Sequence, residues 1–230
     1  MNELSLFTGA GGGLLASHLL GHDVVCAVER DAYCIEVLIQ RQNERTLPAF
    51  PIWDDICTFD GRPWRGTVDL VSGGFPCQAF SNAARGRNIA EKDLWGEMRR
   101  VIGEVCPGVV FAENVSEKSI SKAQDDLLAL GYNSKRIKLS AKDMGADHIR
   151  DRWWLLAYTD MYGQLCSTQH GKVAVMQELC PSVWECQPEQ LRASDGVAFR
   201  MDRLKAIGNG QVPIVAAIAW IKLHQELFSE

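Results

Sequence analysis

The sequence has no continuous apolar run of the roughly 18 to 20 residues that a membrane-spanning helix needs. It also has no internal repeat and no low-complexity tract. Its 47% hydrophobic and 23% charged residues are ordinary for a globular protein, which excludes intrinsic disorder over most of the 230 residues. The first four residues, Met1 to Leu4, lack the basic start of a signal peptide, so we expect a cytoplasmic protein.

Paired metal-binding cysteines are also missing. The chain has eight cysteines but no Cys-x-x-Cys pair, and Cys180 and Cys186 stand apart from any histidine that could complete a zinc site. We therefore expect no metal. Without an export signal, the thiols are predicted to be reduced.

An excess of positive charge is missing too. The chain has 24 Lys and Arg against 29 Asp and Glu, and the net charge of −5 weighs against nucleic acid as a partner. The charge is unevenly distributed, however. Residues 1–60 hold nine acids and three bases, which leaves 20 acids and 21 bases in residues 61–230. Net charge is therefore a poor guide to the partner of this chain.

Short apolar segments alternate with helical patterns along the chain. Strands are predicted over Leu4–Thr8, Val24–Val28, Val68–Ser72, Val109–Ala112 and Trp153–Tyr158. Helices are predicted over Leu14–Leu20, Ala32–Glu44, Leu94–Val105, Lys118–Leu130 and Leu204–Leu227, the last interrupted near its start by Gly208, Gly210 and Pro213. The alternation predicts an α/β fold, a mostly parallel twisted sheet with helices on both faces.

A glycine-rich turn, Phe7 to Gly13, follows the first predicted strand, where it lets backbone approach a ligand. Glu29 ends the second strand 20 residues beyond Gly9, a position from which a carboxylate commonly binds ribose hydroxyls. Together they predict a nucleoside-containing cofactor. A nicotinamide-dependent oxidoreductase is disfavoured because Leu14 replaces the third glycine of its fingerprint. Taken alone, a plain tight turn and a surface Glu explain these residues equally well.

Cys77 lies in the segment Gly73 to Ser81, directly after a predicted strand, where open α/β sheets place their ligands. Pro76 fixes the backbone next to the thiol, and Gly73 and Gly74 leave space around it. A lone loop cysteine is more often inert, so other motifs must decide whether Cys77 reacts.

Five motifs, in order from about residue 4 to 222, resemble those of the cytosine-C5 DNA methyltransferase family. Phe7 to Gly12 is similar to the cofactor motif of that family and Gly73 to Gln78 to its nucleophile loop. Glu113-Asn114-Val115, Arg150-Asp151-Arg152, and Gly208-Asn209 with Val212 are similar to its three later motifs. One Pro-Cys pair would be weak, but five ordered motifs are a strong signal. The chain departs from the family at His148, where glutamine is usual.

The resemblance implies a Rossmann-like fold dependent on S-adenosylmethionine, with S-adenosylhomocysteine as product and no metal. In catalysis, Cys77 would attack C6 of a flipped-out cytosine, Glu113 would pair with N3, Arg152 would bind the base, and Arg150 would hold a loop or a phosphate. The residues implied in cofactor binding are Phe7, Gly9, Gly11, Gly12, Glu29, Asp55, Ile56, Pro76, Leu94, Asn209 and Val212. Those implied in DNA binding are Gln78, Ser81, Arg85 and Arg87.

The implied organisation is a catalytic and cofactor-binding domain over 1–159 and 200–230, with a target-recognition region over 160–199. That region, about 40 residues, is short for the family. We expect a monomer that acts on double-stranded DNA, with a cognate restriction endonuclease or in phage genome protection. Two alternatives stay open: a tRNA cytosine-5 methyltransferase and a catalytically weakened relative that binds DNA or cofactor.

Overall fold

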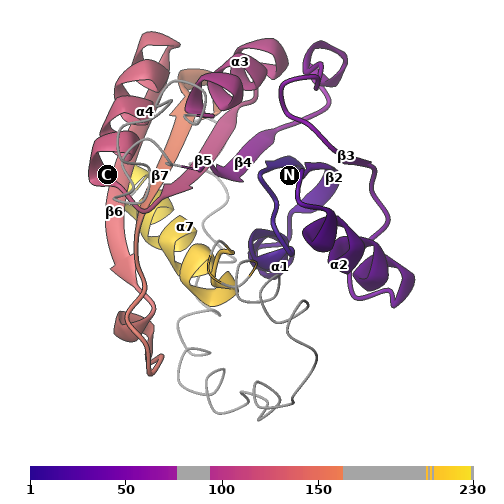
Figure 1. The fold of residues 1–230 in the computed structure, drawn as a ribbon. Coiled ribbons are helices and arrows are strands. Elements are labelled where there is room, and N and C mark those ends of the chain that lie inside the picture. Colours follow the sequence, from indigo (N-terminus) through magenta and orange to yellow (C-terminus); the bar gives the residue numbers. More distant parts are fainter. Residues whose placement is uncertain (77–93, 163–205, 207, 209, 229–230) are drawn as a thin grey trace, which may run out of the picture.

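The computed structural model describes residues 1–76, 94–162, 206, 208 and 210–228. Within these ranges seven strands form one sheet, in the order β3-β2-β1-β4-β5-β7-β6 (Figure 1). Strands β3, β2, β1, β4 and β5 run parallel to one another, and β7 runs antiparallel to β5 and to β6. The predicted α/β fold with a mostly parallel sheet is confirmed.

Most element bounds follow the predicted pattern, but the first strand ends at Leu6 and not at Thr8, and the last helix is assigned from Pro213 and not from Leu204. The strands are β1 (Asn2–Leu6), β2 (Asp23–Val28), β3 (Ile52–Trp53), β4 (Leu70–Gly74), β5 (Val109–Asn114), β6 (Tyr132–Ser140) and β7 (Asp151–Thr159). The helices are α1 (Gly12–Leu19), α2 (Ala32–Asn43), α3 (Trp95–Val105), α4 (Glu117–Ala129) and α7 (Pro213–Phe228), with short 3-10 turns η1 (Arg62–Trp64) and η5 (Lys142–Met144). One correction concerns Gly73 and Gly74, which belong to β4 and not to the loop after it.

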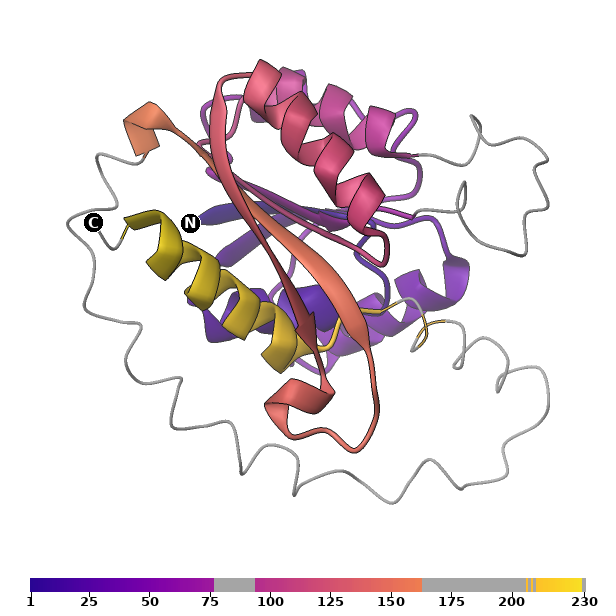
Figure 2. The same ribbon diagram turned by 90° about the vertical axis from the view of Figure 1, so that its left-hand side faces the viewer.

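Helices cover both faces of the sheet (Figure 2). On one face α3 and α4 bury residues such as Met98 and Ile120 against Leu6 of β1. On the other face α7 packs with Phe111 of β5 and Trp154 of β7, while α1 and α2 form a smaller cluster beside them. Strands buried on both faces must be almost wholly apolar, which is why most of them could be predicted from sequence.

Strand β6 was not among the predicted elements. It pairs only with β7, and so it is an edge strand of the described sheet. Its sequence carries Lys135, Arg136 and Lys138, charged residues of the kind that protect sheet edges against unwanted pairing. Because these side chains interrupt the apolar signal, periodicity cannot identify the strand.

The strand order positions the candidate site. Strand β2 lies on one side of β1 and β4 on the other, so the chain changes direction across the sheet at β1. In open α/β sheets ligands bind beyond the carboxyl ends of the strands at such a switch point. Helix α7 packs against α1, and Gln211, just before α7, lies against Gly12 and Gly13 in this region. No helix in the described ranges is long and apolar enough to cross a membrane.

Candidate cofactor and active site

A cavity of about 650 Å³ opens at the carboxyl ends of the central parallel strands. Phe7 and Gly9 line it after β1, Glu29 after β2, Gly74 at the end of β4 and Glu113 near the end of β5. Pockets for small ligands and cofactors commonly measure about 300 to 1,000 Å³. The cavity at the switch point is therefore the candidate functional site.

The turn after β1 has a left-handed backbone. Phe7 has φ 52°, Gly9 has φ 58° and Gly11 has φ 89°. Positive φ is uncommon for a bulky residue such as Phe7, and such strain collects at ligand sites. Thr8 holds the turn in place, since its N–H donates to the Val28 carbonyl (3.2 Å) and its hydroxyl to the Ser5 carbonyl (3.1 Å). The turn thus places Phe7 and Gly9 on the cavity wall.

Glu29 joins this turn to the second strand. Its Oε2 accepts the Gly9 N–H (2.6 Å) and its Oε1 accepts the Asp31 N–H (2.7 Å). Asp31 in turn caps the start of α2 by accepting from the Cys34 N–H (3.3 Å). A carboxylate offers about four lone-pair positions, so Glu29 keeps acceptor capacity for a ligand hydroxyl.

Asp55 and three apolar side chains form another part of the wall. The Asp55 carboxylate accepts the Cys57 N–H (2.9 Å), and this bond lowers the pKa of Asp55 below its ordinary value. Ile56 is buried beside it, and Leu94 and Pro76 line the same cavity. A wall with an acid at Glu29, an acid at Asp55 and apolar surface nearby suits a nucleoside.

Of the implied cofactor-binding residues that the structure describes, three do not line the cavity: Gly11, Gly12 and Val212. A Cβ on Gly12 would stand 2.1 Å from the Gln211 carbonyl oxygen, and one on Gly11 would stand 3.0 Å from the Leu38 side chain. Val212 packs with the α7 cluster. The glycine at position 12 is therefore required by the close approach of the C-terminal segment.

Gly12→Ala is expected to destabilise the protein by about 2 to 3 kcal/mol, because the methyl group overlaps backbone that cannot rotate away. Gly103→Ala in α3 is the matched control. Nothing lies within 4 Å of its Cβ position, so the helix should gain about 0.5 to 1 kcal/mol there. Urea unfolding of both variants checks the prediction, and equal midpoints for Gly12→Ala and wild type would contradict it.

Glu113 is the buried acid of the site, with 7% of its surface exposed. Arg152 of β7 pairs with it, with 2.9 Å between Nε and Oε1, and a second Arg152 nitrogen donates to the Asp151 carbonyl (2.8 Å). Burial raises the pKa of Glu113 to about 7, although Arg152, Arg150 and a hydrogen bond from Gln211 oppose the rise. The carboxyl can therefore hold or release a proton near neutral pH.

Arg150, expected to hold a loop or a phosphate, binds backbone. Its guanidinium donates to the carbonyls of Gly208 (2.9 Å) and Gly210. It does not belong to the residues that line the cavity. The geometry favours the role of holding the segment before α7.

Two residues with defined contacts at the site had no role assigned from sequence. Asn114 is buried, and its side-chain amide donates to the Phe75 carbonyl (2.8 Å), which fixes the backbone just before Pro76. Its place beside Glu113 in the Glu-Asn-Val triplet was the available signal. Gln211 contacts both the glycine turn and Glu113. Its position within the C-terminal motif, between Gly210 and Val212, was the only hint.

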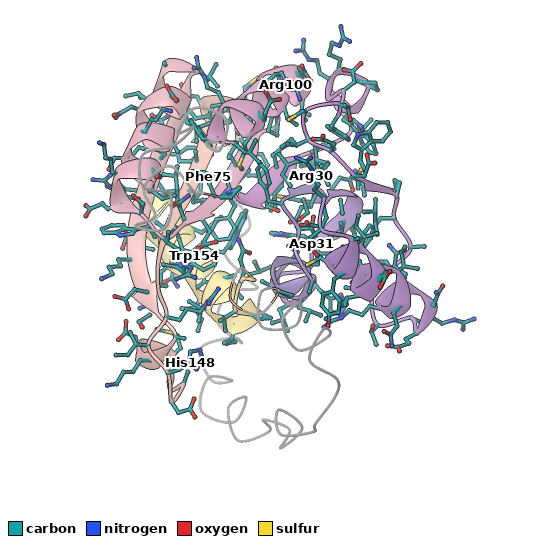
Figure 3. The ribbon with its side chains drawn as sticks, in the orientation of Figure 1. Arg30, Asp31, Phe75, Arg100, His148 and Trp154 are labelled. Carbon is teal, nitrogen blue, oxygen red and sulfur yellow. The ribbon has the colours of Figure 1, made fainter. Side chains whose placement is uncertain are left out.

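Other predicted site residues lie outside the described residues: Cys77, Gln78, Ser81, Arg85, Arg87 and Asn209. His148, which departs from the resembled pattern, is exposed in the loop before β7, with its ring 3.4 Å from the Asp147 carboxylate. Figure 3 shows it well apart from Arg30, Asp31 and Phe75, which line the cavity. In the described part of the chain, no cluster of three or more His, Cys, Asp or Glu is placed to hold a metal ion.

Fold and site together define an α/β protein of the S-adenosylmethionine-dependent methyltransferase class, with a nucleoside-sized cavity at the switch point and a buried acid beside it. The model of the C-5 cytosine-specific DNA methylase family matches residues 1–198, and the chain belongs to this family.

Individual relatives agree with this assignment. The type II methyltransferase M.PspPI of Psychrobacter is 40% identical over 117 residues, 49% of this chain and 26% of the relative. M.HhaI of Haemophilus parahaemolyticus is 26% identical over 175 residues, 67% of this chain and 48% of the relative. A crystal structure described as a prophage-encoded DNA modification methyltransferase of E. coli superposes with a TM-score of 0.55 at 28% identity, over 70% of this chain and 47% of that one. The chain thus spans a quarter to a half of the length of these relatives.

Proposed function

We propose that the protein is a DNA (cytosine-5)-methyltransferase that transfers a methyl group from S-adenosylmethionine to C5 of a flipped-out cytosine. The observation that carries the proposal is the buried Glu113–Arg152 pair, which shares one cavity with Glu29 and Asp55. Pro76 lines the same cavity and directly precedes Cys77 in the chain. The relatives named type II methyltransferases support a role in restriction–modification.

The residues present fit the cofactor. Glu29 has acceptor capacity for ribose hydroxyls, Asp55 is an ionised acceptor for an adenine amino group, and Ile56 and Leu94 offer apolar surface to the ring. When bound, S-adenosylmethionine supplies the methyl group as an electrophilic carbon on a sulfonium. Asn209 and Val212 are assigned to its methionine end on the family resemblance alone.

The chemistry explains why a thiol and a buried acid are needed together. Cytosine C5 is a poor nucleophile, so the Cys77 thiolate first forms a bond to C6 and pushes the electrons of the C5–C6 double bond toward N3. Glu113, protonated, donates its proton to N3 and neutralises that charge. Once C5 carries the methyl group, loss of the C5 proton to a base reforms the double bond, expels the thiolate and returns the N3 proton to Glu113.

The proposed substrate is double-stranded DNA. The target base must leave the stack, at a cost of a few kcal/mol that protein contacts offset. Gln78, Ser81, Arg85 and Arg87 are proposed to contact the flipped base and the phosphates around it, and residues 160–199 to form the short target-recognition region. A cytoplasmic monomer with a cognate endonuclease completes the proposal.

Methyl transfer from tritiated S-adenosylmethionine tests the function. Plasmid DNA and bulk tRNA are offered separately and in competition, and the labelled base is identified after digestion. We expect 5-methylcytosine in the plasmid. Label confined to tRNA would replace DNA by tRNA as substrate, and cofactor binding with no transfer to either would identify a catalytically weakened relative.

Glu29→Gln is expected to weaken cofactor binding by about 10- to 100-fold, because hydrogen bonds to a charged group are worth about 1.5 to 3 kcal/mol. The new amide also turns its own N–H donors toward the N–H of Gly9 or of Asp31, so that a donor faces a donor where wild type has a hydrogen bond. Titration calorimetry with S-adenosylhomocysteine measures the effect. Glu36→Gln, on the exposed side of α2, is the control and should bind like wild type. An unchanged dissociation constant for Glu29→Gln would remove Glu29 from the cofactor site.

A further inference from the structure

We propose that Gln211 is a positioning residue for Glu113, holding the carboxyl so that it faces the target base in one orientation. The proposal rests on the proposed function, because it names what fixes the acid that pairs with N3. Arg152 binds the carboxyl at Oε1. Glu113 Oε2 and the Gln211 side-chain nitrogen both lie beside Gly74, 2.7 Å and 3.2 Å from the point where a Cβ of Gly74 would stand, and the Gln211 side chain makes a hydrogen bond to the Glu113 carboxyl.

The structure contains a slot for this side chain. The missing side chains of Gly12, Gly13 and Gly74 all point to atoms of Gln211: its carbonyl oxygen lies 2.1 Å from the Cβ position of Gly12, and its Oε1 2.6 Å from that of Gly13. The three glycines come from the start of α1 and the end of β4, two separate parts of the chain. Gly13 and Gly74 thus leave room for the Gln211 side chain and Gly12 for its backbone, so the fold places this residue.

Arg150 fixes the backbone on the other side. It donates to the carbonyls of Gly208 and Gly210, in the segment just before Gln211. Arg150 directly precedes β7 and Arg152 is the second residue of that strand, so one short stretch holds both the segment that carries Gln211 and the carboxyl that Gln211 contacts. Arg152 and Gln211 therefore contact the Glu113 carboxyl directly, and Arg150 holds the segment that carries Gln211.

A single hydrogen bond does not orient a carboxyl, because the last torsion of a glutamate rotates over a broad, shallow minimum. A second bond at the other oxygen fixes its plane. The charged groups that face Glu113 in the described residues are Arg152 and Arg150, which both favour the ionised form. Gln211 adds a neutral donor, which orients the carboxyl and also lowers its pKa.

Gln211→Met keeps the length of the side chain and removes both polar atoms. We expect kcat to fall by about 10- to 100-fold, with the KM values for DNA and cofactor changed by less than about threefold, since a hydrogen bond to a charged group is worth about 1.5 to 3 kcal/mol. Loss of the donor should raise the pKa of Glu113, so the alkaline limb of the kcat profile should move to higher pH. Gln211→Glu, of nearly the same shape, should move it further because two carboxyls then share the slot.

The matched control is Gln40→Met on α2. The side-chain amide of Gln40 also donates a hydrogen bond to a carboxylate, Glu44 Oε1 (2.7 Å), but on an exposed helix face. This variant should keep the wild-type kcat and pH profile. That result would show that loss of an amide–carboxylate hydrogen bond elsewhere in the protein does not by itself change kcat.

A ¹³C titration of the Glu113 carboxyl, assigned by its absence in Glu113→Gln, measures the pKa without requiring turnover. If folded Gln211→Met keeps the wild-type pKa of Glu113 and the wild-type kcat, the proposal is overturned. If Gln211→Met does not fold, the pKa of Glu113 in Gln211→Glu is the test, and a wild-type pKa there overturns the proposal. Failure of the proposed function is a different result, since wild type itself would then transfer no methyl group while the titration still reports on Gln211.

Discussion

Cys77→Ala should form no covalent complex with DNA that contains 5-fluorocytosine, and should lose about 10⁴-fold or more of its methyl transfer to ordinary DNA. Alanine offers no electron pair to C6, so C5 never becomes nucleophilic and the chemical route closes. A base cannot remove fluorine from C5 as it removes a proton, so the thiolate is not eliminated after methyl transfer. The wild-type covalent complex should therefore survive denaturing electrophoresis.

The trapping experiment uses a long duplex in which every cytosine is 5-fluorocytosine, so that it needs no knowledge of the recognition site. Labelled cofactor marks the trapped complex. Cys106→Ala is the matched control, because Cys106 is an exposed free thiol at the end of α3 and is not part of the cavity wall. An undiminished complex with Cys77→Ala would show that another residue is the nucleophile.

The central fold could be predicted because burial on both faces restricts the sequence. Val109–Ala112 and Val24–Val28 have almost no polar residues, since helices cover both sides of these strands. The edge strand β6 is not buried in this way, and its charged residues interrupt the apolar pattern by which a strand is predicted. Two-residue β3 is too short for any periodicity.

The candidate site divides in the same way. Glu29 could be identified by its distance from Gly9 along the chain, because strand and helix lengths are nearly constant in the first unit of such folds, and the structure joins the two residues directly. Gly12 and Gln211 are about 200 positions apart. Their contact depends on how α7 returns to α1, which no local pattern records.

The sequence does not distinguish the contacts of the two arginines either. Arg150 and Arg152 are two positions apart, and in extended backbone such side chains point to the same side. Spacing alone therefore cannot tell which of them reaches the acid. The structure separates them, with Arg152 on the Glu113 carboxyl and Arg150 on the backbone before α7. Small differences in reach decide which arginine pairs with the buried acid and which holds the segment before α7.

Glu113→Gln should lower kcat by about 10²- to 10³-fold, because the amide can accept or donate a hydrogen bond at N3 but cannot transfer a proton to it. Wild-type kcat should fall as the pH rises through about 7, where the buried carboxyl loses its proton. The variant should lack this limb. Single-turnover methyl transfer at a series of pH values measures both effects, and a variant with wild-type kcat would exclude proton transfer by Glu113.

The same substitution should have the opposite effect on stability. Burial raises the pKa of Glu113 to about 7, so the folded state holds a proton that the unfolded chain releases near pH 4.5. Wild-type stability therefore falls as the pH rises between these values, whereas the amide in the variant has no charge to bury.

The free energy of unfolding of the variant, relative to that of wild type, should therefore increase by about 2 to 3 kcal/mol between about pH 5 and about pH 8. Urea unfolding at the two pH values measures the difference, and a gap that does not change with pH would show that burial of this carboxyl does not govern its charge. A more stable but nearly inactive variant would identify Glu113 as an acid that the fold keeps for chemistry at the expense of stability.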